Sequence, residues 1–326
     1  MRTSALLPLL PPLAAASGGA TTIEDPWSAS SSSSQARLTT SEFDWASLAA
    51  SKDLEYHDCY GEYKCARLEL PLNWLDESND RTVGIAIMKL PAVVPDDDPS
   101  FGGTVFTNPG GPGLSGVNFL PRMGRHLQKV LDKPGKRHYE ILSFDARGVG
   151  FSTPLADCYE GNEFARKAFT LENRGSGELV GAGVTYNKAL FDAQGLRCKQ
   201  AYDAGNEIFP HAGTPNVARD MVEMLDKIEE LRKKEAGDED AYLELRKRGG
   251  EDETPRLQYV GFSYGTLLGN YFASMFPGRV GRVILDSVCD VYDYATGPGW
   301  LTNTEDMDLT FDEFFNGCHE AGPEVC

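Results

Sequence analysis

The sequence predicts an α/β protein with a mostly parallel sheet and helices on both faces. Short β-prone runs alternate along the chain with stretches whose apolar residues recur at helical spacing. Glycine-rich turns separate several of these runs from the helix that follows. The 326 residues, 41% of them hydrophobic, are enough for one large domain or two smaller ones.

About six strands are expected, each a short apolar run. They span 65–72, 83–90, 104–107, 138–144, 257–260 and 282–286. One helix should follow the glycine-rich loop 108–113 and run to about Leu131, and another should span 266–276. A third should start at Thr214, which can cap it, with Pro215 in its first turn.

Three other segments carry weaker patterns. Residues 155–213 have no clear period, and we expect mostly loop with short helices there. Residues 233–254 are dense in charge and predict a solvated excursion. Near the end of the chain, Phe311, Phe314 and Phe315 lie at helical spacing.

The N-terminus resembles a secretory leader. Arg2 gives a basic start, Ala5 to Ala16 is apolar, and small residues follow as far as Ala20. We therefore expect a signal peptide at 1–20, with a disordered Ala/Pro leader as the alternative, and a flexible Ser-rich lead-in at 21–50. No other stretch reaches the ~18 apolar residues of a membrane span.

The net charge of −18 argues against some classes of partner but does not identify one. Nucleic acid and anionic membrane surfaces would be repelled, so neither is expected to bind. An acidic chain with a leader fits a secreted, extracellular protein.

Seven cysteines fit an oxidising compartment. Spacing alone favours three pairs and leaves Cys289 free, although connectivity cannot be deduced from sequence. The expected pairs are Cys59–Cys65, Cys158–Cys198 and Cys318–Cys326. A metal site is a poor alternative, because the chain has no Cys-x-x-Cys and its five histidines are scattered.

The chain is organised around Ser263, which lies in Gly261-Phe262-Ser263-Tyr264-Gly265. The β-prone run 257–260 precedes this motif and the apolar helical pattern 266–276 follows it. A strand, a sharp turn and a helix form the context in which a serine hydroxyl becomes an exposed nucleophile. The backbone N–H of Tyr264 could then face a developing oxyanion. The alternative is a serine in an ordinary glycine-rich turn.

A second glycine-rich loop, Asn108 to Gly113, also follows a strand and precedes a helix. Its glycines allow backbone N–H groups to approach a substrate, with Gly111 the best donor and Gly110 beside it. Residues 111–116 also match Gly-x-Gly-x-x-Gly, which raises a dinucleotide site. That site needs an acidic residue ~20 positions on, and Asp145 comes about nine residues too late.

Four motifs in order resemble those of one family. They are Asn108-Pro109-Gly110-Gly111-Pro112-Gly113, Asp145-Ala146-Arg147-Gly148, Thr214-Pro215-Asn216-Val217-Ala218-Arg219-Asp220 and Gly261-Phe262-Ser263-Tyr264-Gly265-Thr266. Their order and spacing, over roughly 55–326, are similar to those of the tripeptidyl aminopeptidase branch of the proline iminopeptidase-like α/β hydrolases. The outer cysteine pairs also resemble those of secreted members.

The resemblance implies an α/β-hydrolase fold and serine-dependent release of short peptides from protein N-termini, with no cofactor. It makes Ser263 the nucleophile and gives the oxyanion hole to the N–H groups of Tyr264 and Gly111. Asp145 and Arg147 would shape the active-site loop. Asp145 is a poor triad acid, because this fold orders its triad as serine, acid, histidine. Asp286 is expected to be structural.

The chain departs from the family pattern in two places. It has Ser287 and Cys289 where the family usually has Gly and Val. The family's acid and histidine follow later strands, whereas the one histidine after Ser263 here is His319. We therefore expect the hydrolase core at 51–290 to lack the last two strands, 291–326 to begin a cap region, and the chain alone to be inactive.

The expected substrate is a peptide or another small acyl compound. A carboxylesterase or lipase on the same fold is one alternative, because the same serine turn serves any acyl transfer. A non-catalytic binding protein that kept the turn and lost the triad is another. The sequence does not indicate the oligomeric state.

Overall fold

The computed structural model describes residues 43–76, 78–175, 182–238, 240, 242–243, 254–296 and 302–326. The expected signal peptide, the start of the lead-in and most of the charged excursion after Ala236 lie outside these residues. In the described part, no helix is both long enough and apolar enough to cross a membrane.

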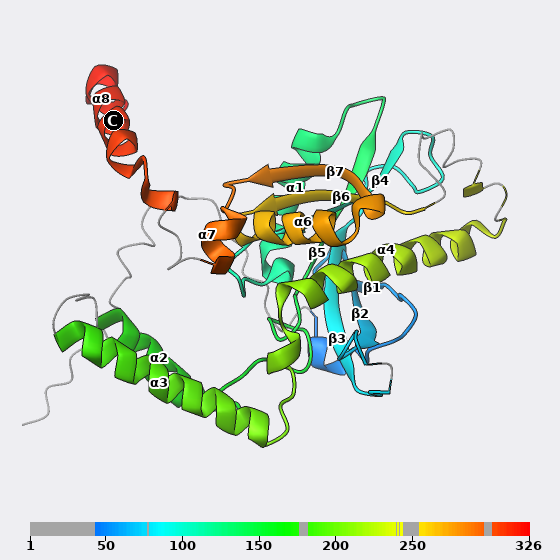
Figure 1. Ribbon diagram of the computed structural model, residues 1–326. Helices are drawn as coiled ribbons and strands as arrows, with labels where there is room; N and C mark the ends of the chain where they lie inside the picture. Colours follow the sequence, from blue (N-terminus) through cyan, green and yellow to red (C-terminus); the bar gives the residue numbers. More distant parts are fainter. Residues whose placement is uncertain are drawn as a thin grey trace, which may run out of the picture. The chain divides into compact units, whose positions relative to one another are not determined.

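A single seven-stranded sheet forms the centre of the protein (Figure 1). Its strands are β1 (His57–Cys59), β2 (Tyr63–Pro71), β3 (Thr82–Leu90), β4 (Phe101–Asn108), β5 (His138–Phe144), β6 (Leu257–Phe262) and β7 (Val280–Asp286). Their order is β1-β2-β3-β5-β4-β6-β7. The pairs from β1 to β5 are antiparallel, and β5, β4, β6 and β7 run parallel. The predicted mostly parallel α/β sheet is confirmed, with the short β1 as an addition.

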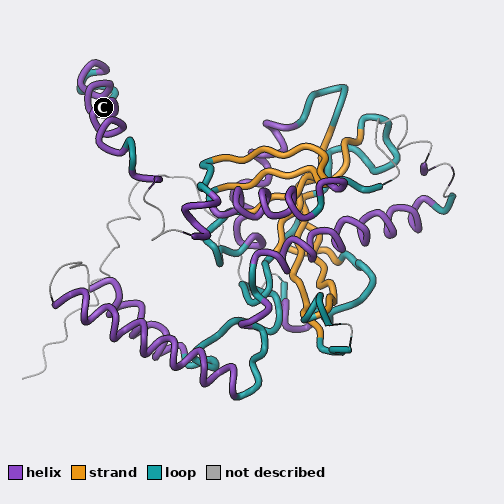
Figure 2. Tube along the Cα trace, viewed as in Figure 1, coloured by secondary structure: helices purple, strands orange, loops and turns teal. Residues whose placement is uncertain are grey.

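Both faces of the sheet are covered by helices (Figure 2). Helix α1 (Gly116–Leu131) packs on one face, and α4 (Thr214–Ala236) and α6 (Tyr264–Met275) pack on the other. The described residues also form α2 (Glu163–Gly175), α3 (Ala182–Asp203), α7 (Val291–Thr296) and α8 (Met307–Ala321). Short 3₁₀ turns occur at η1 (Trp45–Ser47), η2 (Phe209–His211), η3 (Pro277–Arg279) and η4 (Thr302–Thr304).

Alternation along β3 shows how the two cores form. Ile85 and Ile87 pack with α4 and α6, whereas Ala86 and Met88 pack with α1 on the opposite face. All four side chains are fully buried. A central strand that is apolar on both faces is what a sheet sandwiched between helices requires. This sandwich fixes the strand ends from which the site is built.

Two expectations about helices are wrong. Residues 155–213 contain the long helices α2 and α3 instead of mostly loop. Thr214 does not cap α4, because the helix begins at Thr214 itself and Gly213 occupies the cap position without a side-chain bond. The helix expected around Phe311 is confirmed as α8.

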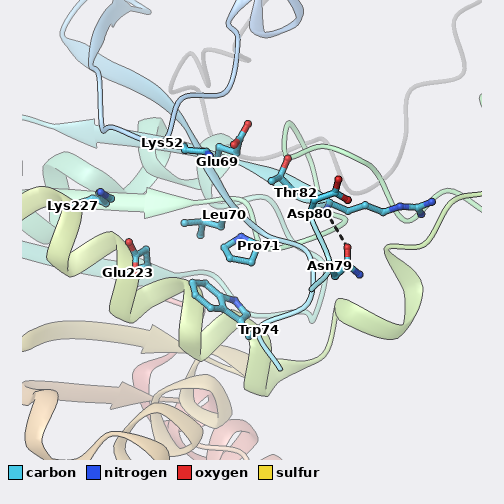
Figure 3. A pocket seen from close by; sticks show the side chains of 11 residues that line it. Lys52, Glu69, Leu70, Pro71, Trp74, Asn79, Asp80, Thr82, Glu223 and Lys227 are labelled. Carbon is cyan, nitrogen blue, oxygen red and sulfur yellow. Dashed lines mark hydrogen bonds between the residues drawn. The ribbon is translucent and has the colours of Figure 1, made fainter. Parts of the chain in front are cut away.

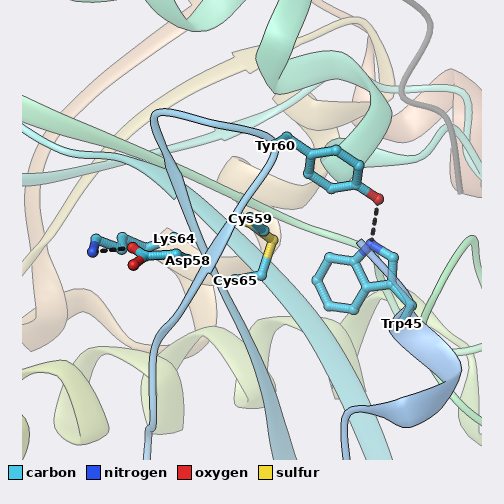
Figure 4. Close-up of a disulfide and its surroundings, with 6 residues drawn as sticks. All are labelled: Trp45, Asp58, Cys59, Tyr60, Lys64 and Cys65. Atoms are coloured by element: carbon cyan, nitrogen blue, oxygen red, sulfur yellow. Dashed lines mark hydrogen bonds and ion pairs between the residues drawn. A yellow bond between two sulfur atoms is a disulfide. The ribbon is translucent and has the colours of Figure 1, made fainter. Parts of the chain in front are cut away.

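The segment 43–50 is folded, although we expected a flexible lead-in there. Trp45 is 4% exposed and stacks on Phe151, with ring centroids 5.4 Å apart. Its indole N–H donates to the Tyr60 hydroxyl at 3.0 Å, next to the Cys59–Cys65 disulfide (Figure 4). The aromatic cluster gives this segment enough buried surface to be ordered.

The disulfides are the three pairs expected from spacing: Cys59–Cys65, Cys158–Cys198 and Cys318–Cys326. Cys289 has a free, buried thiol. The middle pair ties α3 to the loop before α2, and the last pair ties the end of α8 to Cys326.

Candidate active site

Ser263 occupies the sharp turn between β6 and α6. Its backbone has φ 53° and ψ −122°, an unusual conformation for a residue other than glycine. Such strain costs on the order of 1–3 kcal/mol and persists only where the surroundings enforce it. Here the Ser263 N–H donates to the Asp286 carbonyl of β7 at 3.1 Å, and the Ser263 carbonyl accepts from the Thr266 hydroxyl at 2.6 Å. The turn is therefore held from both sides.

The two glycines of the Ser263 motif are sterically required. A Cβ on Gly261 would lie 2.5 Å from the Gly265 carbonyl oxygen. A Cβ on Gly265 would lie 2.8 Å from the Asn108 carbonyl oxygen. The Gly-x-Ser-x-Gly spacing thus reflects close packing of β6, α6 and the loop after β4.

The loop 108–113 lies directly against Ser263. Gly110 has φ +98°, and a Cβ there would lie 2.6 Å from the Phe262 carbonyl oxygen and 2.9 Å from the Ser263 Cβ. The Gly110 N–H donates to the Asn108 side-chain oxygen at 2.9 Å, so this predicted oxyanion donor is already engaged. The N–H groups of Gly111 and Tyr264 have no hydrogen-bond partner among the described residues.

Two tyrosine hydroxyls fix the backbone around this turn. Tyr259 donates to the Gly265 carbonyl at 2.8 Å, and the hydroxyl oxygens of Tyr264 and Thr214 are 2.7 Å apart. Burial raises the pKa of both tyrosines, so both stay protonated at neutral pH. The sequence motifs include Thr214 and Tyr264 but give no sign that the two touch.

Asp145 is fully buried and ties the loop after β5 to α1. Its carboxylate accepts from the Ser115 hydroxyl at 2.7 Å, the Val117 N–H at 3.0 Å and the Phe151 N–H at 2.7 Å. Burial raises the pKa of Asp145 against the opposing effect of these hydrogen bonds. This carboxylate organises the loop, and within the described residues no hydrogen bond joins it to Ser263.

Arg147 lies in a buried cluster with Asp220 and Trp74. Its guanidinium forms a two-pronged ion pair with Asp220 at 2.5 and 2.6 Å and also donates to the carbonyls of Pro71 and Leu72. The Trp74 indole N–H donates to Asp220 at 2.8 Å. The cluster joins the loop after β5 to α4 and the end of β2. From the sequence, Asp220 was part of a motif but had no predicted role, and Trp74 was not predicted to belong to the site.

Known proteins offer several relatives at low identity, although no family model matches the chain. A tripeptidyl aminopeptidase of Streptomyces lividans is 26% identical over 273 residues, which are 82% of this chain and 43% of that protein. The serine protease Hip1 of Mycobacterium tuberculosis is 28% identical over 69% of this chain and 36% of its own length. Carboxylesterase B of the same species is 30% identical over 48% of this chain and 28% of its own.

The parallel order β5-β4-β6-β7, with a serine in the sharp turn between β6 and α6, is the arrangement of an α/β hydrolase. The chain has the α/β-hydrolase fold. The relatives further indicate a serine hydrolase or peptidase on this fold, and the chain spans less than half the length of each of the three.

Within the described residues, no hydrogen bond joins the Ser263 side chain to a histidine. His319 lies exposed on α8. Asp286 is exposed, and its carboxylate accepts from the Ser287 hydroxyl at 3.0 Å. No group of three or more His, Cys, Asp or Glu in the described part of the chain could hold a metal ion.

Proposed function

We propose that the chain carries the nucleophile of a serine peptidase of the aminopeptidase type, which releases short peptides from N-termini. The observation that supports this most is the strained Ser263 turn with Gly110 packed against it. The names of two relatives, a tripeptidyl aminopeptidase and a serine protease, support peptide substrates.

In the proposed mechanism, the Ser263 oxygen attacks the carbonyl of the scissile peptide bond. The N–H groups of Tyr264 and Gly111 donate to the oxyanion that forms, since neither has a hydrogen-bond partner among the described residues. Tyr264 directly follows the serine, and Gly111 directly follows Gly110, which packs against it. A general base takes the serine proton and passes it to the departing amine, which leaves an acyl-enzyme on Ser263. Water then hydrolyses the ester and frees the short peptide.

Hydrolysis of a tripeptide amide by the full-length protein tests this proposal. Ser263→Ala should remove turnover to below about a hundredth of the parent rate, because no nucleophile remains. Ser274→Ala serves as the matched control and should keep the parent rate, because Ser274 is exposed on α6, the helix that follows Ser263. If Ser263→Ala retains more activity than that, Ser263 is not the nucleophile.

A second candidate, a carboxylesterase, is favoured by the 30% identity to a carboxylesterase over 158 residues. The same turn and the same donors would serve an ester. The ratio of turnover on a short acyl ester to turnover on the tripeptide amide distinguishes the two. An ester preference that disappears with Ser263→Ala would favour the esterase.

We also propose that the protein is extracellular. The three disulfides support this, because such bonds persist in oxidising compartments. Peptide mapping without reduction should find Cys289 as the one alkylated cysteine after unfolding. Alkylation of Cys59 or Cys326 in the native protein would contradict the disulfides and, with them, the support for an extracellular protein.

A further inference from the structure

A pocket of about 370 Å³ lies between α4 and the end of the β2–β3 hairpin (Figure 3). It is lined by Lys52, Glu69, Leu70, Pro71, Trp74, Asn79, Asp80, Arg81, Thr82, Glu223 and Lys227. None of these residues belongs to the Ser263 turn or to the loop 108–113. The pocket is therefore a separate site, and its volume suits a small ligand or one side chain of a larger one.

The wall formed by Trp74 is rigid. Its indole N–H is held by Asp220 at 2.8 Å, and the Arg147 guanidinium carbon lies 5.8 Å from the ring centroid. Because Asp220 neutralises Arg147, this contact places no net positive charge on the ring. The Pro71 ring and Leu70 continue the apolar wall (Figure 3). A fixed indole surface binds flat cationic groups without losing side-chain freedom.

The charges around this wall are three carboxylates and three cations, but the cations are mostly engaged. Arg81 forms an ion pair with Glu207, and Lys227 pairs with Glu230 at 2.8 Å; neither acid lines the pocket. The carboxylates of Glu69, Asp80 and Glu223 take part in no ion pair among the described residues. Lys52 is the one lining cation in no ion pair among the described residues, and Lys227 also acts on Glu223. The pocket therefore holds more carboxylates than cations outside ion pairs, next to an aromatic face.

Glu223 is the carboxylate that a ligand would affect most. It is half-buried on α4, where burial raises its pKa and the charge of Lys227, one turn along the helix, partly opposes that rise. A half-buried carboxylate without an ion pair gains most from a cation that enters beside it. Figure 3 places Glu223 and Trp74 on the same side of the pocket.

We propose that this pocket binds the guanidinium group of an arginine side chain on a peptide. The planar group would stack on Trp74 and Pro71 while its N–H groups donate to Glu223 and the neighbouring carboxylates. An ammonium group would lack the stacking surface and should bind less well. The inference does not rest on the proposed peptidase activity, because the two sites share no residue.

Isothermal titration of the full-length protein with N-acetyl-arginine amide tests the proposal, with N-acetyl-citrulline amide as a neutral ligand of nearly the same shape. The arginine ligand should bind saturably, and the citrulline ligand about threefold or more weakly, with the difference shrinking in high salt. N-acetyl-lysine amide should also bind more weakly than the arginine ligand. Equal affinities for arginine and citrulline, or no saturable binding of the arginine ligand, would overturn the proposal.

Variants on α4 give the matched comparison. Glu223→Gln should weaken binding of the arginine ligand about three- to tenfold. Glu235→Gln, the same change at an exposed position of the same helix outside the pocket, should leave it within about twofold. Trp74→Phe should also weaken binding, and Glu223→Gln keeps the test decisive if the Trp74 variant folds poorly. Equal effects of the two glutamine changes would contradict the site.

Discussion

The hydroxyl groups of Thr214 and Tyr264 are hydrogen-bonded, with their oxygens 2.7 Å apart. Thr214 is the first residue of α4, and Tyr264 follows Ser263 and begins α6. This bond therefore ties Tyr264, whose N–H is the proposed oxyanion donor, to α4. The Thr214 side chain, at the first position of α4, thus makes a tertiary contact and does not cap its own helix.

Removing this bond should slow the reaction at Ser263. Thr214→Val leaves the Tyr264 hydroxyl buried without its partner, which costs about 1–3 kcal/mol of unfolding free energy. We expect a several-fold slower reaction of Ser263 with a fluorophosphonate, because the Tyr264 N–H is less well placed. Thr214→Ser keeps the hydroxyl and should restore the rate. A Val variant that reacts at the parent rate would show that the bond does not position the turn.

Space at Gly110 should be essential, because a side chain there would collide with Ser263. Gly110→Ala would place a Cβ 2.9 Å from the Ser263 Cβ and should abolish fluorophosphonate labelling. Gly113→Ala is the matched control, since Gly113 also has a positive φ but no atom lies within 4 Å of a Cβ there. It should lose only the ~1 kcal/mol typical of backbone strain. Equal loss of labelling in both variants would argue against the collision.

Most of the sheet could be predicted from sequence because each buried strand is a compact apolar run. β1 was not predicted because its three residues are too few to show the alternation of apolar and polar residues that marks a strand. α3 was missed for another reason: its apolar side chains are spread around the helix, and Phe191 and Leu196 are exposed, so no stripe marks a buried face.

The site was predicted only as far as its motifs are local. The turn at Ser263 is one continuous segment, and its glycines indicate that the backbone around it is closely packed. The pair Arg147 and Asp220 joins residues 73 positions apart, and no spacing rule connects them. The engagement of Gly110 by Asn108 likewise depends on loop geometry that sequence does not give.

The buried ion pair of Arg147 and Asp220 should be costly to break from one side. Asp220→Ala leaves the arginine charge uncompensated in a site where both side chains are at most 1% exposed. We expect a loss of about 3–5 kcal/mol in urea unfolding. Asp192→Ala removes an exposed helical pair with Lys188 and should change stability by less than about 0.5 kcal/mol. Similar losses in the two variants would contradict this assignment.

Glu140 should make the protein sensitive to acid. Burial alone would raise its pKa, but the charges of Lys89 and Arg232, with hydrogen bonds from Thr104 and Lys89, lower it to about 2 from 4.5. Because the folded-state pKa is depressed, this carboxylate stabilises the fold above pH ~4.5, and the contribution is lost as pH falls towards ~2. The lost contribution is on the order of 3 kcal/mol.

Urea unfolding at several pH values checks this prediction. The Glu140→Gln variant should lose less stability in acid than the parent does. At neutral pH, the variant should be less stable than the parent. Glu313→Gln, at an exposed position on α8, should follow the parent curve. Parallel pH curves for Glu140→Gln and the parent would exclude this role of Glu140.

The central claim is that Ser263 is an activated nucleophile, and covalent labelling tests it most directly. The folded full-length protein should react with a fluorophosphonate, and mass spectrometry of its peptides should find the adduct on Ser263. Labelling should vanish in Ser263→Ala and persist in Ser274→Ala. A folded protein whose Ser263 stays unlabelled, or an adduct on another serine, would contradict the account.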